Sequence, residues 1–212
     1  MPTPTPAKIC GLTRPEDAEA AVRLGASYLG VIFAGGPRQV AIPRAREIRT
    51  AAGQVPVFGV FSSRSREEIL KVRDRVGLAG AQLHGGATPK LVEGLTSEGL
   101  MVLVVTRLTG LEDLPRLDFA RSLGAPVLVE PHVPGRLGGT GVPLSLDLAR
   151  SARERLAGHQ MFLAGGLTPD SVADAVRAAR PDAVDVSSGV EQIPGVKDHD
   201  RLARFLEVLQ WA

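Results

Sequence analysis

Short apolar runs alternate with helical patterns eight times along this chain, and this alternation limits the fold more than any other feature. Each run is strand-sized and apolar almost throughout, which is typical of parallel strands that helices cover on both faces. The predicted strands end near 10, 33, 61, 84, 105, 130, 164 and 186. The predicted helices cover about 15–24, 43–53, 66–76, 89–98, 112–122, 144–156, 169–178 and 200–210.

Eight such units without a linker or a leftover segment predict an α/β protein with a single closed (β/α)₈ barrel, the TIM-barrel fold, over residues 1–212. An open doubly wound sheet of the flavodoxin or Rossmann type is the alternative. It would leave two or three units unaccounted for, and no predicted strand is followed by Gly-x-Gly-x-x-Gly. Residues 1–6, with proline at every second position, are expected to form an irregular N-terminal tail.

The charge and the composition argue against several classes of protein. The formal net charge is +2 and the 25 Lys and Arg residues are scattered, which argues against nucleic-acid binding. No apolar run is long enough to span a bilayer, and the N-terminus lacks the features of a signal peptide. The single cysteine, Cys10, excludes an internal disulfide. We therefore expect a cytoplasmic protein without membrane contact.

Capping signals fix two of the helix starts. Thr13 and Glu16 have the spacing of a capping box, and Ser65 and Glu68 repeat it. The first of these signals places Cys10 at the C-terminal end of the first strand, directly before a short loop. In an α/β barrel that edge is where reactive groups are displayed. A lone cysteine is also often an inert core residue, and both interpretations remain open at this point.

Polar residues at the carboxyl ends of barrel strands face one shared site. Lys8 lies two residues before Cys10, so both side chains are expected to point inward, where the ammonium group would favour the thiolate. The other candidates, taken in chain order, are Cys10, Arg38, Gln82, His84, Glu130, Gly165, Gly166, Asp185, Ser187, Ser188 and Gly189.

Two of these segments predict a phosphate site. Gly165 and Gly166 follow the seventh strand, and Ser187, Ser188 and Gly189 follow the eighth at an expected helix start. Backbone N–H groups at a helix N-terminus stabilise a dianion, and glycine lets the backbone approach it. Both segments are also ordinary turn sequences, but their position after strands seven and eight favours phosphate.

Cys10 and Glu130 form a candidate base and acid for a proton-transfer reaction. A thiol and a carboxyl group on opposite sides of a barrel mouth can remove and deliver protons if their surroundings tune them. A solvated carboxylate at the rim is the alternative for Glu130.

Several motifs together resemble the phosphoribosylanthranilate isomerase family of tryptophan biosynthesis. They are Lys-Ile-Cys-Gly-Leu-Thr at 8–13, Gln-Leu-His-Gly at 82–85, Ala-Gly-Gly-Leu at 164–167, Val-Asp-Val-Ser-Ser-Gly-Val-Glu at 184–191 and Pro-Gly-Val-Lys-Asp at 194–198. The resemblance runs from residue 8 to the last predicted helix.

The resemblance implies an Amadori rearrangement of N-(5′-phosphoribosyl)anthranilate. Glu130 would protonate the furanose ring oxygen, and Cys10 would remove the C2′ proton. No metal or cofactor is expected, because the substrate's own iminium serves as the electron sink. Arg38 would pair with the anthranilate carboxylate.

The remaining candidates follow from the same resemblance. Lys8, Gln82, His84 and Asp185 would contact the substrate, while Gly165, Gly166, Ser187, Ser188 and Gly189 would hold its phosphate. The expected partner is therefore a small phosphorylated molecule. The family includes monomers and homodimers, so both states remain open.

The chain departs from the family pattern near the substrate. The family's acid is an aspartate after Leu-Leu, whereas this chain reads Val-Leu-Val-Glu-Pro with Glu130. The loop at 34–39 lacks the usual basic and serine residues, and 105–107 lacks the usual lysine-alanine pair. Glycines at 135, 138, 139 and 141 suggest a lid.

Two other functions remain as alternatives. One is a related sugar-phosphate isomerase such as the histidine-pathway ribotide isomerase, although that enzyme typically uses two aspartates and Cys10 argues against it. The other is a non-catalytic binder of a phosphorylated ligand, with Glu130 marking a lost activity.

Overall fold

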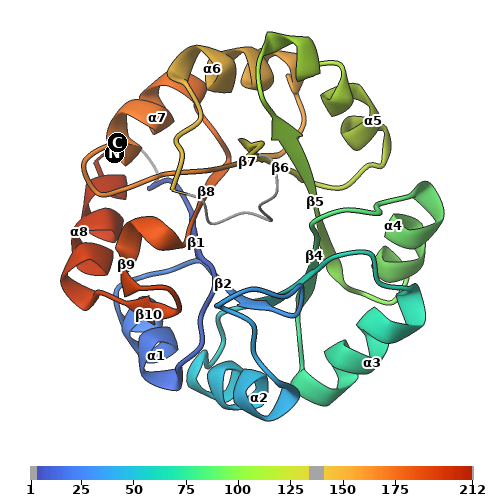
Figure 1. The fold of residues 1–212 in the computed structure, drawn as a ribbon, viewed down its shortest axis with the longest axis vertical. Helices are drawn as coiled ribbons and strands as arrows, with labels where there is room; N and C mark the ends of the chain where they lie inside the picture. The colour runs from blue at the N-terminus through green and yellow to red at the C-terminus, as the bar shows by residue number, and fades with distance from the viewer. Residues whose placement is uncertain (1–3, 134–140, 212) are drawn as a thin grey trace.

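Eight parallel strands close into a barrel in the computed structural model, which describes residues 4–133 and 141–211 (Figure 1). The strands follow one another in chain order, and β8 pairs with β1 to close the sheet. Their bounds are β1 Ala7–Ile9, β2 Tyr28–Ile32, β3 Val57–Phe61, β4 Gly80–Leu83, β5 Met101–Leu108, β6 Val127–Pro131, β7 Met161–Ala164 and β8 Ala183–Val186. The predicted (β/α)₈ barrel is confirmed.

Helices surround the barrel, one after each strand (Figure 1). They are α1 Pro15–Arg23, α2 Ile42–Ala51, α3 Arg66–Val76, α4 Pro89–Thr96, α5 Arg116–Ser122, α6 Leu146–Arg155, α7 Val172–Ala179 and α8 His199–Leu209, with short 3₁₀ helices η1 Leu111–Asp113 and η2 Ser188–Val190. Over the described residues, none of the helices combines the length and the apolar character that crossing a membrane requires.

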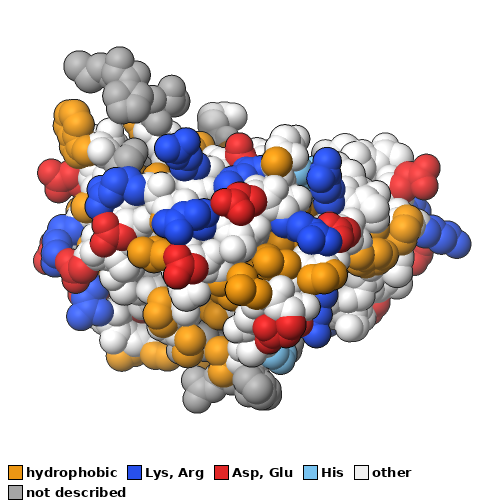
Figure 2. Space-filling view, turned by 90° about the horizontal axis from the view of Figure 1, so that it is seen from above, with side chains coloured by type: hydrophobic (Ala, Val, Ile, Leu, Met, Phe, Trp, Pro, Cys, Tyr) orange, Lys and Arg blue, Asp and Glu red, His pale blue; other side chains and the backbone are white. Residues whose placement is uncertain are grey.

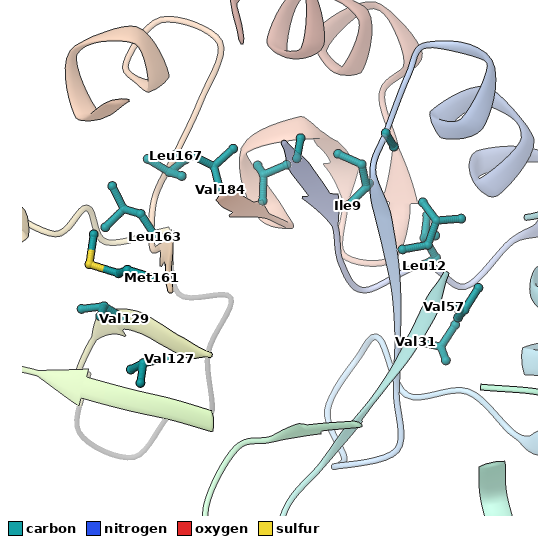
Figure 3. Close-up of a cluster of buried hydrophobic side chains, with 14 of the residues drawn as sticks. Ile9, Leu12, Val31, Val57, Val127, Val129, Met161, Leu163, Leu167 and Val184 are labelled. Carbon is teal, nitrogen blue, oxygen red and sulfur yellow. The ribbon is translucent and has the colours of Figure 1, made fainter. Parts of the chain in front are cut away.

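The barrel has an apolar layer outside it and a smaller cluster inside it. The outer layer lies between strands and helices, and Figure 3 shows part of it, including Ile9, Val31, Val57, Val127, Val129, Met161, Leu163 and Val184. The second cluster is made of Phe58, Leu103, Leu128, Phe162, Ala164 and Ala183. Leu128 lies between Val127 and Val129 on one strand, so it points to the opposite face, into the barrel. Further along each strand, the inward-facing side chains line the end of the barrel at which the strands have their carboxyl ends.

An antiparallel hairpin follows η2 and was not predicted from the sequence. It pairs β9 Glu191–Ile193 with β10 Val196–Lys197. The hairpin also explains why the capping box expected at Thr13 is wrong. The Thr13 hydroxyl donates to the carbonyl of Gly195 at 2.5 Å, and α1 begins after Arg14 with no side-chain cap. Both hydrogen bonds of the other capping box, between Ser65 and Glu68, are present.

Charges of both signs mix on the surface. On the face in Figure 2, Lys and Arg side chains lie among Asp and Glu side chains, with apolar groups between them. This face carries no patch of a single sign, as the scatter of charges in the sequence predicts.

Candidate active site

One pocket at the carboxyl ends of the strands joins most of the residues predicted from the sequence. Glu130 at the end of β6 and Asp185 on β8 share it with the two predicted phosphate segments. The residues that line it are Glu130, Pro131, Gly141, Ala164, Gly165, Gly166, Leu167, Asp185, Val186, Ser187, Ser188 and Gly189. Of the glycines suggested as a lid, 135, 138 and 139 lie outside the described residues, and Gly141 lines the pocket.

The loops after β7 and β8 approach each other backbone to backbone, and this contact requires glycine. A Cβ on Gly189 would overlap the carbonyl oxygen of Leu167. Gly166 makes a second close approach, to the segment before α6: a Cβ there would lie 2.5 Å from the backbone nitrogen of Pro143, and the φ of Gly166 is +60°. The helix start predicted after β8 is present as the short 3₁₀ helix η2. The result is a concave surface of backbone groups, of the kind that binds phosphate in barrels.

Cys10 lies beside a buried ion pair at the first strand. Lys8 is fully buried, and its Nζ lies 2.7 Å from Asp185 Oδ1. Burial lowers the pKa of Lys8, but the charges of Asp185 and Cys10 outweigh it and raise that pKa to about 12. Burial raises the pKa of the Cys10 thiol, and the charge of Lys8 opposes this shift. Lys8 therefore acts in the predicted direction, although burial has the larger effect on the pKa of the thiol.

Gly30 on β2 provides the space that the thiol and the ammonium group occupy. A Cβ there would lie 2.9 Å from Cys10 Sγ and 3.0 Å from Lys8 Nζ. We expect Gly30→Ala to displace both groups and to lower turnover roughly tenfold to a hundredfold, since small misplacements of reacting groups are costly. The measurement is kcat at saturating substrate beside thermal unfolding.

Gly59→Ala on β3 is the matched control for Gly30→Ala. A Cβ on Gly59 would meet Leu78 and Phe61, at 2.7 Å from each, instead of the candidate base. Both variants should lose about 1–3 kcal/mol of stability through overpacking, but only Gly30→Ala should lose turnover. Equal losses of turnover in the two variants would contradict a specific role for Gly30.

Glu130 lies in a cluster with His84 and Arg107. His84 Nε2 is 2.9 Å from Glu130 Oε1, and Arg107 Nε is 3.5 Å from the same oxygen. Arg107 Nη2 also lies 3.1 Å from His84 Nδ1 and donates to the His84 carbonyl at 3.0 Å. His84 Nε2 and Arg107 Nε lie close to Glu130 Oε1, but none of the described residues makes an aligned hydrogen bond to this buried oxygen.

Arg107 was missed from the sequence because the fifth strand was expected to end at Val105. The strand continues to Leu108, and Arg107 pairs in register with Glu130 on β6. Leu103 and Val105 belong to the inner face. Because every second side chain of a strand points to the same face, Arg107 also points inward, and extending the predicted strand by two residues would have placed it at the site.

Arg38, in the loop after β2, forms an ion pair with Glu191 of β9. Its Nη2 lies 2.7 Å from Glu191 Oε2, and its Nε donates to both carboxylate oxygens. Arg38 thus reaches the rim, as predicted, but its nearest carboxylate belongs to the protein. Burial raises the pKa of Glu191, but hydrogen bonds from Arg38 and the charge of Lys197 outweigh it and hold that pKa below its usual value.

Lys197 links the loops after β1 and β8 to the hairpin. Its buried Nζ donates to the Cys10 carbonyl at 2.7 Å, to the Ser187 carbonyl at 3.1 Å and to Glu191 at 2.9 Å. Burial lowers the pKa of Lys197. One ammonium group therefore holds the loops after β1 and β8 together through their backbone carbonyls. Glu191 and Lys197 belong to the motifs at 184–191 and 194–198 but were not predicted as site residues, because their contacts depend on the hairpin.

Gln82 reaches the same end of the barrel from β4. Its side chain is buried, and its Oε1 has no hydrogen-bond partner in the part of the chain that the structure describes. Buried polar atoms are rarely left unpaired, so this oxygen is available to a ligand. The predicted place of Gln82 in the substrate site is consistent with this.

Comparisons with known proteins agree on one family. The family model described as N-(5′-phosphoribosyl)anthranilate (PRA) isomerase matches residues 7–208. The chain is 41% identical over 217 residues to N-(5′-phosphoribosyl)anthranilate isomerase from Symbiobacterium thermophilum, covering 94% of this chain and 95% of the relative. It is also 41% identical over 202 residues to the enzyme of that name from Trichlorobacter lovleyi, with the same coverage of each chain.

Solved structures give the same result. Phosphoribosyl anthranilate isomerase from Thermotoga maritima superposes with a TM-score of 0.88 at 32% identity, covering 98% of this chain and 100% of that chain. The Thermus thermophilus enzyme gives 0.84 at 34% identity, covering 96% and 98%. A complex of such an isomerase with reduced 1-(o-carboxyphenylamino)-1-deoxyribulose 5-phosphate gives 0.85 at 31% identity, covering 98% and 100%.

Proposed function

The chain belongs to the N-(5′-phosphoribosyl)anthranilate isomerase family, and on that premise we propose that Cys10 and Glu130 are its general base and general acid. The reaction is the isomerisation of N-(5′-phosphoribosyl)anthranilate to 1-(2-carboxyphenylamino)-1-deoxyribulose 5-phosphate in tryptophan biosynthesis. It is an aldose–ketose isomerisation that moves protons without net oxidation.

The proposed steps use one proton donor and one acceptor. The Glu130 carboxyl group gives its proton to the furanose ring oxygen as the bond from that oxygen to C1′ breaks, leaving an open-chain iminium. The Cys10 thiolate then removes the C2′ proton, and the electron pair moves to the iminium nitrogen to form an enolamine. Tautomerisation of the enolamine gives the ketone product. Acid–base assistance of this kind contributes about 10²- to 10⁴-fold in rate.

One observation carries this proposal: the carboxyl group of Glu130 and the glycine-lined loops after β7 and β8 border the same pocket. A sugar phosphate held by Gly165, Gly166, Ser187, Ser188 and Gly189 would extend its furanose ring toward Glu130 and Asp185. Asp185 binds Lys8, and the charge of Lys8 is the strongest of the charges that lower the pKa of the Cys10 thiol. The pocket therefore joins the proposed phosphate site to the candidate acid, while Cys10 is not among its lining residues and is linked to it through Lys8 and Asp185.

Arg38 remains our candidate partner for the anthranilate carboxylate. Glu191 occupies its Nε and Nη2, so the substrate would use the remaining guanidinium nitrogen, Nη1. Gln82 and His84 complete the proposed substrate contacts. The state of assembly, monomer or homodimer, and the cytoplasmic location stay predictions; one structural relative is described as generated monomers of the dimeric isomerase from Thermotoga maritima.

A two-substrate assay tests the function. We expect the fluorescence of N-(5′-phosphoribosyl)anthranilate to decay at a rate proportional to the enzyme concentration. The aminoimidazole-carboxamide ribotide of histidine biosynthesis should show no turnover and should compete weakly, because Cys10 stands where that chemistry uses an aspartate. Turnover of the ribotide alone would favour the related isomerase. Tight binding of the product analogue without any turnover would favour the non-catalytic binder.

A further inference from the structure

Arg107 lies at the site without a role in the proposed steps, and its contacts restrict its neighbour His84. Its side chain is about one-fifth exposed and lies against both His84 and Glu130, which also approach each other directly. From these contacts we propose that Arg107 is a positioning residue, which fixes His84 as the neutral tautomer with its proton on Nε2. The inference rests on the proposed function, because it concerns whether His84 competes with the substrate for the proton of Glu130.

The tautomer follows from the donor inventory. A guanidinium group has only donors, so Arg107 Nη2 at 3.1 Å from His84 Nδ1 requires Nδ1 to accept. A neutral imidazole that accepts at Nδ1 carries its hydrogen on Nε2. Arg107 Nη2 also donates to the His84 carbonyl at 3.0 Å, which holds the guanidinium at the ring from a second direction.

This tautomer decides what His84 can do to the acid. Its Nε2 lies 2.9 Å from Glu130 Oε1, close enough to exchange a proton if Nε2 were bare. With a hydrogen already on Nε2, the ring cannot take the proton of Glu130 there. Protonation at Nδ1 would place an N–H against the N–H of Arg107 and set two cations side by side. His84 Nε2 can therefore only donate toward Glu130, once substrate binding aligns the hydrogen bond, and the ring is not the base of Glu130.

The same contact orients the acid after it has reacted. Glu130 Oε1 is buried without an aligned hydrogen bond in the described structure, and catalytic hydrogen bonds commonly tighten only when substrate binds. Once the proton has passed to the ring oxygen, the new carboxylate has the Nε2–H and the Arg107 guanidinium within 2.9 and 3.5 Å. Arg107 therefore acts on the reaction through His84 and Glu130, without touching the substrate.

Nitrogen-15 NMR of the imidazole rings tests the tautomer directly in the full chain. The sequence has four histidines, and His84→Gln assigns the signal of interest. At neutral pH we expect wild-type His84 to show one protonated nitrogen, Nε2, and one bare nitrogen, Nδ1. Arg107→Met should convert the ring to imidazolium paired with Glu130, with both nitrogens protonated. Arg107→Lys, which keeps a cationic donor, should preserve the wild-type pattern.

Kinetics test the consequence. Arg107→Met should lower kcat roughly tenfold to a hundredfold with KM within about twofold, because the acid is lost and binding is not. In a His84→Gln background the same change should cost much less, since no ring remains to take the proton. Arg107→Lys should retain most of the wild-type kcat.

Three results would overturn the proposal. They are a wild-type His84 protonated on Nδ1, an Arg107→Met variant that raises KM while leaving kcat intact, or equal losses with and without His84. The first is visible even if the proposed function fails. That failure would appear separately, as full activity in a variant whose residue 130 cannot donate a proton.

Discussion

The Cys10→Ser variant is expected to lose kcat by roughly a thousandfold, within the 10²–10⁴-fold range of acid–base assistance, while its unfolding temperature stays unchanged. Serine nearly preserves the size of the side chain, but its hydroxyl does not ionise in the accessible pH range, so no base remains. The fold should tolerate the change because the neighbouring contact from Lys197 is made to the backbone carbonyl of Cys10. Decay of substrate fluorescence and a thermal scan measure the two quantities.

The interpretation of this variant depends on binding as well as rate. The affinity for a reduced product analogue should change little, because Cys10 is not among the residues proposed to hold the phosphate or the anthranilate carboxylate. Loss of binding together with loss of rate would indicate that serine had disturbed Lys8 and Asp185, which lie beside the thiol. Near-wild-type kcat in Cys10→Ser would exclude Cys10 as the base.

The barrel and one side of its site could be predicted because both depend on local patterns. The strands at 161–164 and 183–186 were predicted with the bounds that the structure has. The residues that follow these two strands could be assigned to the site because the carboxyl ends of all barrel strands lie at the same end of the barrel. The same local reasoning failed at Thr13, whose hydroxyl bonds to Gly195, far along the chain.

The missed residues depend on contacts between distant segments. Glu191 engages Arg38, and Lys197 reaches Cys10 through a hairpin that local patterning does not reveal. Nothing in the sequence around Arg38 indicates that an internal carboxylate would occupy it. Arg107 differs, because its inward direction follows from period two once β5 is known to continue to Leu108.

Substitutions at residue 130 should separate the chemistry of the acid from its placement. Glu130→Gln keeps the size and the buried position but cannot donate an acidic proton, so we expect kcat to fall by roughly a thousandfold. Glu130→Asp keeps the carboxyl group but draws it back by about one bond length. A shift on the order of 1 Å can cost about a hundredfold. Both effects are measured as kcat on N-(5′-phosphoribosyl)anthranilate.

The outcome of Glu130→Asp depends on which partners set the position of the acid. Glu130 extends from the end of β6, and its Oε1 lies 2.9 Å from His84 Nε2. A shorter aspartate would retreat from that ring and from Arg107, so the variant should be slower than wild type although it carries the family's usual residue. If Glu130→Asp were instead faster, the cluster with His84 and Arg107 would be holding the acid away from its best position. If Glu130→Gln kept near-wild-type kcat, the proton donor would have to be another group, and Asp185 in the same pocket would be the first to examine.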